Sequence, residues 1–176
     1  LSITMVLALT TLYGLRGFPP NALTHQGYKD MPFAVALDKY CDDPCSYLML
    51  TDNSDHTLRL GVYENGFHAS RFTSMWFLPA AIKETLSPSK EQFYLSMLGQ
   101  DMERFHPDTV IVLKNLPGYD GFDFIKYFER DSSFLGQWKN YELAGTLSLD
   151  RTIYYPGYTT AMNGHGASFF EIYKRQ

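Results

Sequence analysis

The side chains best suited to chemistry gather in one stretch of the sequence, around His68. Tyrosine, glutamate and asparagine precede this histidine, and arginine and tryptophan follow it. Dense mixtures of aromatic and polar side chains suit surfaces that bind carbohydrate or lipid headgroups, and they also occur at the edge of an ordinary core. Open α/β sheets bind ligands beyond the carboxyl ends of their strands. Asp52 directly follows the strand that we expect at 46–51, so it belongs to the same candidate surface. We therefore expect a substrate-binding surface that includes Asp52, Tyr63, Asn65, His68, Arg71 and Trp76.

The other chemical groups predict neither a metal site nor a cofactor site. The five histidines lie far apart, and none has H-x-x-x-H spacing. The sequence contains no G-x-G-x-x-G, G-K-[ST] or G-x-S-x-G motif, so it offers no nucleotide loop and no nucleophile elbow. A glycosidase needs two carboxylates roughly 5–9.5 Å apart. The sequence does not show which acids lie at that distance from one another; the candidates are Asp52, Asp55, Glu64, Asp120 and Asp123. We assign no catalytic residue and expect no cofactor.

The two cysteines, Cys41 and Cys45, are spaced C-x3-C. Zinc knuckles and redox pairs use C-x2-C, and no second pair completes four ligands. Two interpretations stay open. The thiols are free, or they form a local disulfide in an oxidising compartment, since a turn can bring two Cα atoms within the required distance.

Length and composition indicate one folded domain. The chain has 176 residues, of which 45% are hydrophobic and 19% charged. A domain of this size buries roughly 70% of the surface that its unfolded chain exposes, so its core must hold it together. Fifteen basic residues against nineteen acidic ones, without a basic cluster, argue against nucleic acid as a partner.

Residues 1–15 carry no charge. A helix of that length spans about 22 Å, less than the ~30 Å hydrocarbon core of a bilayer. The segment is then a buried element of the domain, the trailing half of a membrane helix, or another targeting segment. We treat residues 1–20, which end in Pro19 and Pro20, as an apolar segment and linker, and residues 21–176 as a soluble α/β domain.

Helical and strand patterns alternate along the middle of the chain. Residues 109–113 are β-branched or apolar throughout, which suits the covered centre of a sheet flanked by helices. The order favours an α/β three-layer sandwich with a mostly parallel central sheet and antiparallel carboxy-terminal edge strands. The aromatic-rich stretch 71–82 is expected to break at Pro79. We expect helices at 33–40, 88–105, 122–130 and 133–138, and strands at 46–51, 109–113, 143–155 and 169–173.

Several passages, taken in order, resemble a known family. They are the strand Tyr-Leu-Met-Leu-Thr at 47–51, Ser-Arg-Phe-Thr-Ser-Met-Trp-Phe-Leu-Pro at 70–79, Pro-Asp-Thr-Val-Ile-Val at 107–112, and the closing strand at 170–175. In this order they are similar to the extracytoplasmic carboxy-terminal domain of polytopic, GT-C type glycosyltransferases of the protein-mannosyltransferase-like group. The resemblance covers nearly the whole chain.

The resemblance implies a parent enzyme that transfers sugar from a polyprenyl-phosphate donor to an acceptor outside the cytoplasm. The acidic catalytic residues of such enzymes lie in a loop between early membrane helices, so none is carried over here. This chain would be a non-catalytic, membrane-attached domain on the extracytoplasmic side that helps to shape acceptor or substrate access. Its partners would be the membrane portion of the parent and carbohydrate or lipid-linked sugar.

Two alternatives remain. A free-standing hydrolase would use paired carboxylates near His68. A protein-interaction module would expose an apolar patch built from Phe67, Phe72, Trp76 and Phe77. Under the leading hypothesis, replacing Arg71 and Trp76 with alanine stops transfer and leaves the melting temperature nearly unchanged.

Overall fold

The strand expected at 109–113 lies at the centre of the sheet. The computed structural model describes residues 32–42, 44–52, 57, 66–116, 118–150 and 167–176. Within these ranges Thr109–Leu113 forms β3, and all five of its side chains are buried. Strand β1, Cys45–Leu50, lies beside it and is likewise buried along its whole length. Both strands are apolar on two faces because both faces are covered.

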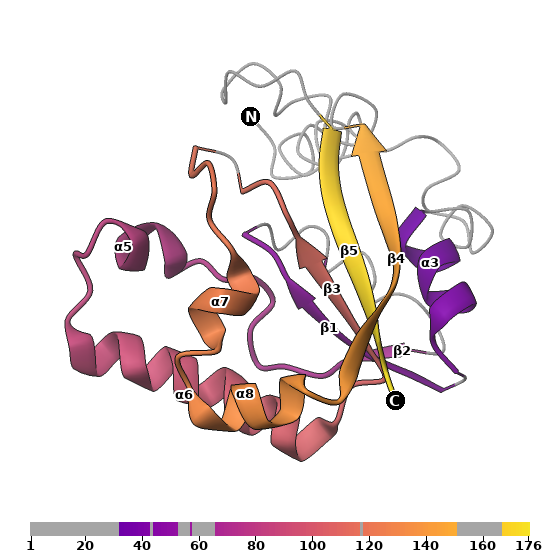
Figure 1. Ribbon diagram of the computed structural model, residues 1–176, viewed down its shortest axis with the longest axis horizontal. Coiled ribbons are helices and arrows are strands. Elements are labelled where there is room, and N and C mark those ends of the chain that lie inside the picture. The colour runs from indigo at the N-terminus through magenta and orange to yellow at the C-terminus, as the bar shows by residue number, and fades with distance from the viewer. Residues whose placement is uncertain (1–31, 43, 53–56, 58–65, 117, 151–166) are drawn as a thin grey trace, which may run out of the picture.

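Five strands form one sheet in the described part of the chain, in the order β2-β1-β3-β5-β4 (Figure 1), where β2 is Gly66–His68, β4 is Tyr141–Asp150 and β5 is Ala167–Arg175. Strand β1 is parallel to β2 and β3, whereas β5 is antiparallel to β3 and β4. The expected antiparallel carboxy-terminal strands are therefore present, with β4 at the sheet edge. The sheet as a whole is evenly mixed rather than mostly parallel, because the last strand inserts between β3 and β4.

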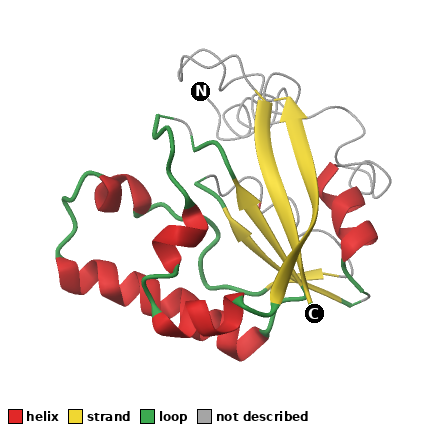
Figure 2. Cartoon of the chain, in the orientation of Figure 1, coloured by secondary structure: helices red, strands yellow, loops and turns green. Residues whose placement is uncertain are grey.

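The helices fall on two sides of this sheet (Figure 2). On β5, Phe170 meets Phe33 of α3 edge to face at 5.0 Å, and Tyr173 meets Trp138 of α8 at 4.7 Å. Residues three apart on a strand point to opposite faces, so α3 and α8 cover opposite faces of the sheet. The helices are α3 Pro32–Tyr40, α5 Leu78–Ile82, α6 Pro88–Phe105, α7 Phe124–Phe128 and α8 Ser132–Trp138.

Helix α6 begins and ends where its sequence predicts. Ser87 is extended and Pro88 follows it at the first helical turn, where the missing N–H costs nothing. The Ser87 hydroxyl makes no capping hydrogen bond, so the proline marks this start. At the other end His106 adopts the left-handed conformation, with φ 45°, and Pro107 follows it.

The expected break at Pro79 is wrong. Pro79 lies in the first turn of α5, so it opens a helix instead of ending one. A proline in that turn loses no intrahelical hydrogen bond, since the first four N–H groups of any helix lack such partners.

Helix α3 ends at Tyr40, and a disulfide follows directly after it. Cys41 and Cys45 are bonded, with their Cα atoms 5.4 Å apart. The bridge joins the end of α3 to the start of β1. Next to it, the Thr109 hydroxyl donates to the carbonyl of Tyr40, which ties the same helix end to the central strand.

No helix in the described ranges is long and apolar enough to cross a bilayer. The apolar segment and linker at 1–20 lie outside the described residues, as do Asp55, Glu64 and residues 151–155 of the strand expected at 143–155.

Candidate functional site

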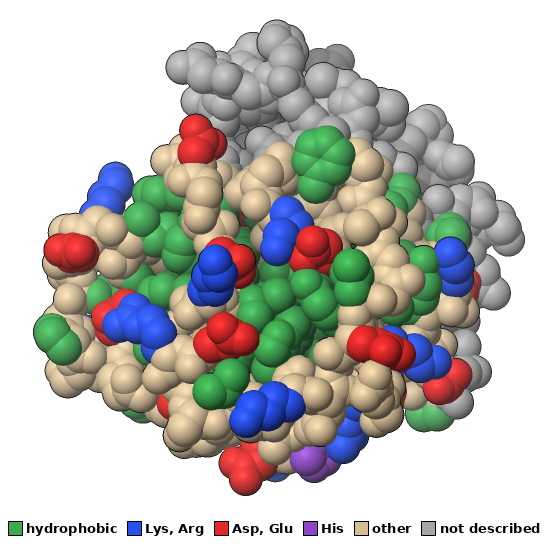
Figure 3. Space-filling model, in the orientation of Figure 1, with side chains coloured by type: hydrophobic (Ala, Val, Ile, Leu, Met, Phe, Trp, Pro, Cys, Tyr) green, Lys and Arg blue, Asp and Glu red, His purple; other side chains and the backbone are tan. Residues whose placement is uncertain are grey.

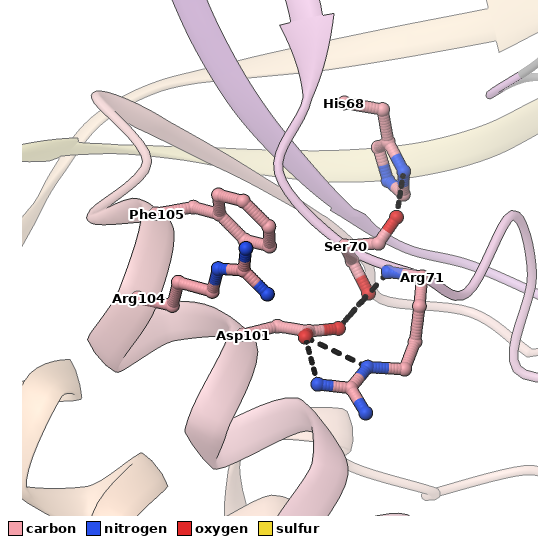
Figure 4. Close-up of a pocket in the computed structure, with 6 residues that line it drawn as sticks. All are labelled: His68, Ser70, Arg71, Asp101, Arg104 and Phe105. Atoms are coloured by element: carbon pink, nitrogen blue, oxygen red, sulfur yellow. Dashed lines mark hydrogen bonds and ion pairs between the residues drawn. The ribbon is translucent and has the colours of Figure 1, made fainter.

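A pocket of about 310 Å³ opens between the end of β2 and the last two turns of α6 (Figure 4). Strand β2 and the loop after it supply three of its residues, and α6 supplies the other three. Parallel pairing with β1 positions the strand, and burial of Leu98 and Met102 turns the helix toward it. The lining residues are His68, Ser70, Arg71, Asp101, Arg104 and Phe105.

The floor of this pocket is an ion pair whose acid is buried and whose arginine is partly exposed. Asp101 is only 1% exposed, and its Oδ1 accepts from Arg71 Nε at 2.8 Å and Nη2 at 2.7 Å. Its Oδ2 accepts from the Ser70 hydroxyl at 3.0 Å and from the Arg71 backbone N–H at 2.9 Å. Four donors and one cation thus stabilise the ionised form of a carboxylate that has left water. With this many bonds, Asp101 is poorly suited to accept a proton from a substrate.

His68 is neutral and has both ring nitrogens engaged. Its Nδ1 lies 3.1 Å from the Ser70 carbonyl oxygen, so Nδ1 carries the proton and donates. Its Nε2 accepts from the Met49 N–H at 3.4 Å. Burial lowers the pKa of His68 from 6.5 to about 4, against the opposing effects of Ser70 and Asp101. The imidazole positions the loop after β2 and leaves no nitrogen for general-base work.

Arg104 is the second cation of the pocket. Its guanidinium lies 5.1 Å from the centre of the Phe105 ring, and it pairs with no acid among the described residues. Phe105 in turn packs edge to face on Phe67 at 6.3 Å. The pocket therefore has a charged side and an aromatic side.

The structure describes four of the six residues expected to bind substrate, and it brings two of these four together. His68 and Arg71 line the pocket, but Trp76 does not, and it is 64% exposed beside Tyr94. Asp52 does not line the pocket either, and the carbonyl of the preceding Thr51 accepts a hydrogen bond from the N–H of Met75. The remaining two, Tyr63 and Asn65, lie outside the described residues.

Sequence reasoning missed the half of the pocket that α6 contributes. Asp101 and Arg104 lie some thirty residues after His68 and belong to no motif. One signal was present: Asp101 falls three residues after Leu98 and next to Met102, on the apolar stripe of an amphipathic helix. A charged residue on such a stripe is almost never fully buried without a partner.

The same residues also bear on the two alternative functions, a hydrolase and a protein-interaction module. Among the described lining residues, Asp101 is the single carboxylate, so this pocket holds no facing pair for a hydrolase. The expected apolar patch is also wrong in part, because Phe72 and Phe77 are buried in the core and only Phe67 and Trp76 are exposed.

Apolar side chains do gather on another face, where α7 and α8 meet the long carboxy-terminal strands (Figure 3). Trp138 stacks on Phe134 and Tyr141 there, and Leu143 of β4 and Phe169 of β5 are more than half exposed. The residues that the structure describes include no group of three or more metal-ligating side chains.

Comparison of the chain with protein-family models, with curated proteins and with solved structures gives no match. The pocket is therefore interpreted from its own residues: an ion pair with further hydrogen bonds, a neutral histidine, and an arginine that pairs with no acid in the described ranges.

Proposed function

We propose that this chain is a non-catalytic extracytoplasmic domain of an integral-membrane, glycosyltransferase-like protein. The parent uses a polyprenyl-phosphate sugar donor, and the domain contributes to acceptor or substrate access. Its partners are the membrane portion of the parent and carbohydrate or lipid-linked sugar, and nucleic acid is not one of them. In this proposal the mixed sheet with α3 on one face and α6 to α8 on the other is a three-layer sandwich.

The observation that carries the proposal is the Cys41–Cys45 disulfide. Disulfides persist in oxidising compartments and are rare where thiol reductants act, so the bridge supports a location outside the cytoplasm. The pocket supports the non-catalytic part, because its acid and its histidine are both engaged in internal hydrogen bonds. The family resemblance of the sequence supplies the membrane-bound parent.

Thiol trapping in intact cells tests the location. Free thiols are blocked with a small maleimide, the protein is denatured, and the cysteines are labelled with and without reduction. The proposal predicts that both cysteines label only after reduction, whereas the lone, partly exposed Cys41 of the Cys45→Ser variant is blocked at the first step. Cysteines that are blocked at that step in the unaltered protein would place the chain in a reducing compartment and overturn the proposal.

The coding sequence upstream of Leu1 tests the membrane parent. Several apolar runs of about 20 residues are expected there, and their absence would contradict the membrane-bound parent.

In the intact protein, Trp76→Ala should reduce sugar transfer with little change in melting temperature, because this side chain is mostly exposed.

A further inference from the structure

We propose that the pocket formed by His68, Ser70, Arg71, Asp101, Arg104 and Phe105 is a binding site for a singly charged phosphodiester. The proposal rests on the proposed function only in assigning binding, and not catalysis, to this pocket. The phosphodiester can belong to a soluble molecule or to a lipid headgroup, and the experiment below separates these two sources.

The charge of the pocket sets the charge of the ligand. Arg71 and Arg104 are cationic, Asp101 is anionic and His68 is neutral at pH 7. The pocket therefore carries one net positive charge, which complements a monoanion. A phosphodiester is a monoanion at this pH, whereas a phosphate monoester carries between one and two negative charges.

The donors that remain set the geometry of the ligand. Arg71 uses Nε and Nη2 on Asp101, which leaves its Nη1 without a hydrogen bond to any described residue. The Arg104 guanidinium keeps all its N–H donors, since that group makes no hydrogen bond or ion pair with any described residue. In Figure 4 the Arg71 guanidinium, from the loop after β2, lies against the Asp101 carboxylate, and the Arg104 guanidinium, from α6, lies beside Phe105 on the other side of that carboxylate.

Two arginines from different elements suit a tetrahedral anion. A carboxylate is planar, and a single guanidinium fork can take both of its oxygens. The two non-bridging oxygens of a phosphodiester diverge, so each can accept from a different arginine. Because the buried Asp101 holds Arg71 in place, that donor is ordered before a ligand arrives, which lowers the entropic cost of binding.

The aromatic side of the pocket favours an organic ester over inorganic phosphate. Phe105 lines the pocket, and Phe67, 51% exposed, lies against it at the rim. The ester substituent of the ligand would pack on these rings. A volume of about 310 Å³ is at the lower end for ligand pockets and matches a headgroup, not a lipid chain.

The test measures binding to the 176-residue chain by amide chemical shifts, followed at Ser70, Arg71 and Phe105. The soluble probe is sn-glycero-3-phosphoglycerol, and glycerol is the uncharged control. In the second arm, the chain is sedimented with phosphatidylcholine vesicles that contain or lack phosphatidylglycerol, which presents the same headgroup. Binding to the soluble probe assigns a soluble phosphodiester, and binding only to phosphatidylglycerol vesicles assigns a lipid.

Arg104→Ala is the decisive variant, because an exposed arginine can be removed without disturbing the core. Lys90→Ala is its matched control: it removes one exposed positive charge from the same helix, outside the pocket. We expect Arg104→Ala to weaken binding at least tenfold in whichever arm binds, and Lys90→Ala to leave it within about twofold.

Three outcomes would overturn the proposal: no binding in either arm, equal loss in both variants, or the same shifts with glycerol. None of them touches the state of the cysteines, so a failure here leaves the proposed location standing. Conversely, cysteines that are reduced in cells would refute the location and leave a measured phosphodiester affinity intact.

Discussion

At the scale of single residues, the pocket depends on a carboxylate that water no longer reaches. Asp101 is ionised and buried, and Arg71 is the one cation that the described residues place on it. Removing one partner of a buried ion pair leaves an uncompensated charge, which costs more than the pair itself contributes. We therefore no longer expect the melting temperature to stay nearly unchanged when Arg71 is replaced with alanine, and we expect a loss of stability instead.

Arg71→Ala is predicted to lower the free energy of unfolding by about 3 kcal/mol. Arg130 provides the matched control, because it pairs with Glu91 at 2.8 Å and is about as exposed as Arg71, whereas Glu91 is 19% exposed and Asp101 only 1%. Arg130→Ala should cost about 1 kcal/mol or less, since solvent screens an exposed pair. Urea unfolding of both variants measures the difference. Equal losses would mean that Asp101 is not buried as an ion.

The buried His68 predicts that the stability of the domain depends on pH. Its pKa is about 4 in the folded chain and 6.5 when unfolded. Between these values the unfolded state binds a proton that the folded state refuses, so stability is full above about pH 6.5 and falls as pH drops toward 4. We expect His68→Gln to remove part of this slope in urea unfolding measured across the window.

Nitrogen-15 spectra of the imidazole provide the check on that assignment. They should show a neutral ring with the proton on Nδ1 at pH 6, because Nε2 accepts from a backbone N–H. A ring that titrates near 6.5, or a variant with an unchanged slope, would contradict burial as the cause.

At the scale of elements, the close approach of α6 and α8 holds the helical layer together. Asp131 caps α8 by accepting from the N–H groups of Ser133 and Phe134, and its other oxygen accepts from Gln92 of α6. A Cβ on Gly99 would lie 2.5 Å from Asp131 Oδ1 and 2.9 Å from the Phe134 nitrogen. The glycine of one helix thus leaves room for the cap of the next.

The two helical glycines give a matched pair of substitutions. Gly99→Ala should lower stability by about 2 kcal/mol, because the methyl group forces α8 away from α6. Gly136→Ala, where nothing lies within 4 Å of the new Cβ, should raise stability by about 0.5–1 kcal/mol through helix propensity. Thermal and urea unfolding of both variants test this. A neutral Gly99→Ala would mean that the two helices pack less closely.

At the scale of the whole molecule, one disulfide connects the helix on one face of the sheet to a central strand. Cys41 and Cys45 are four residues apart, so the closed loop is short and removes little entropy from the unfolded chain. Loop-closure entropy gives about 2 kcal/mol for such a loop. The core of β1 and β3 side chains supplies far more burial than this.

Reduction is therefore predicted to weaken the domain without unfolding it. The melting temperature should fall by roughly 4–8 °C in the presence of a phosphine reductant. The Cys41→Ser/Cys45→Ser double variant should melt at the reduced value and show no response to the reductant. Unfolding of the reduced chain at room temperature would contradict a stability that rests on the apolar core.

Local pattern was enough for the elements whose signals lie within a few residues. The β-branched run of β3 and the proline-marked ends of α6 were predicted with their bounds, since strand propensity and helix termination are properties of neighbours in sequence. The order of the strands was not predicted in full. Whether β5 pairs with β3 depends on contacts between segments some sixty residues apart.

The candidate site was likewise predicted from the sequence only in part. By composition alone the sequence determined that aromatic and polar groups cluster around His68, and it named Arg71 among them. Only the tertiary structure decided that Asp101 and Arg104 join them and that Trp76 lies elsewhere. The physical reason is that residue types report what a side chain can do, whereas the packing of α6 against β2 and its loop decides which side chains meet.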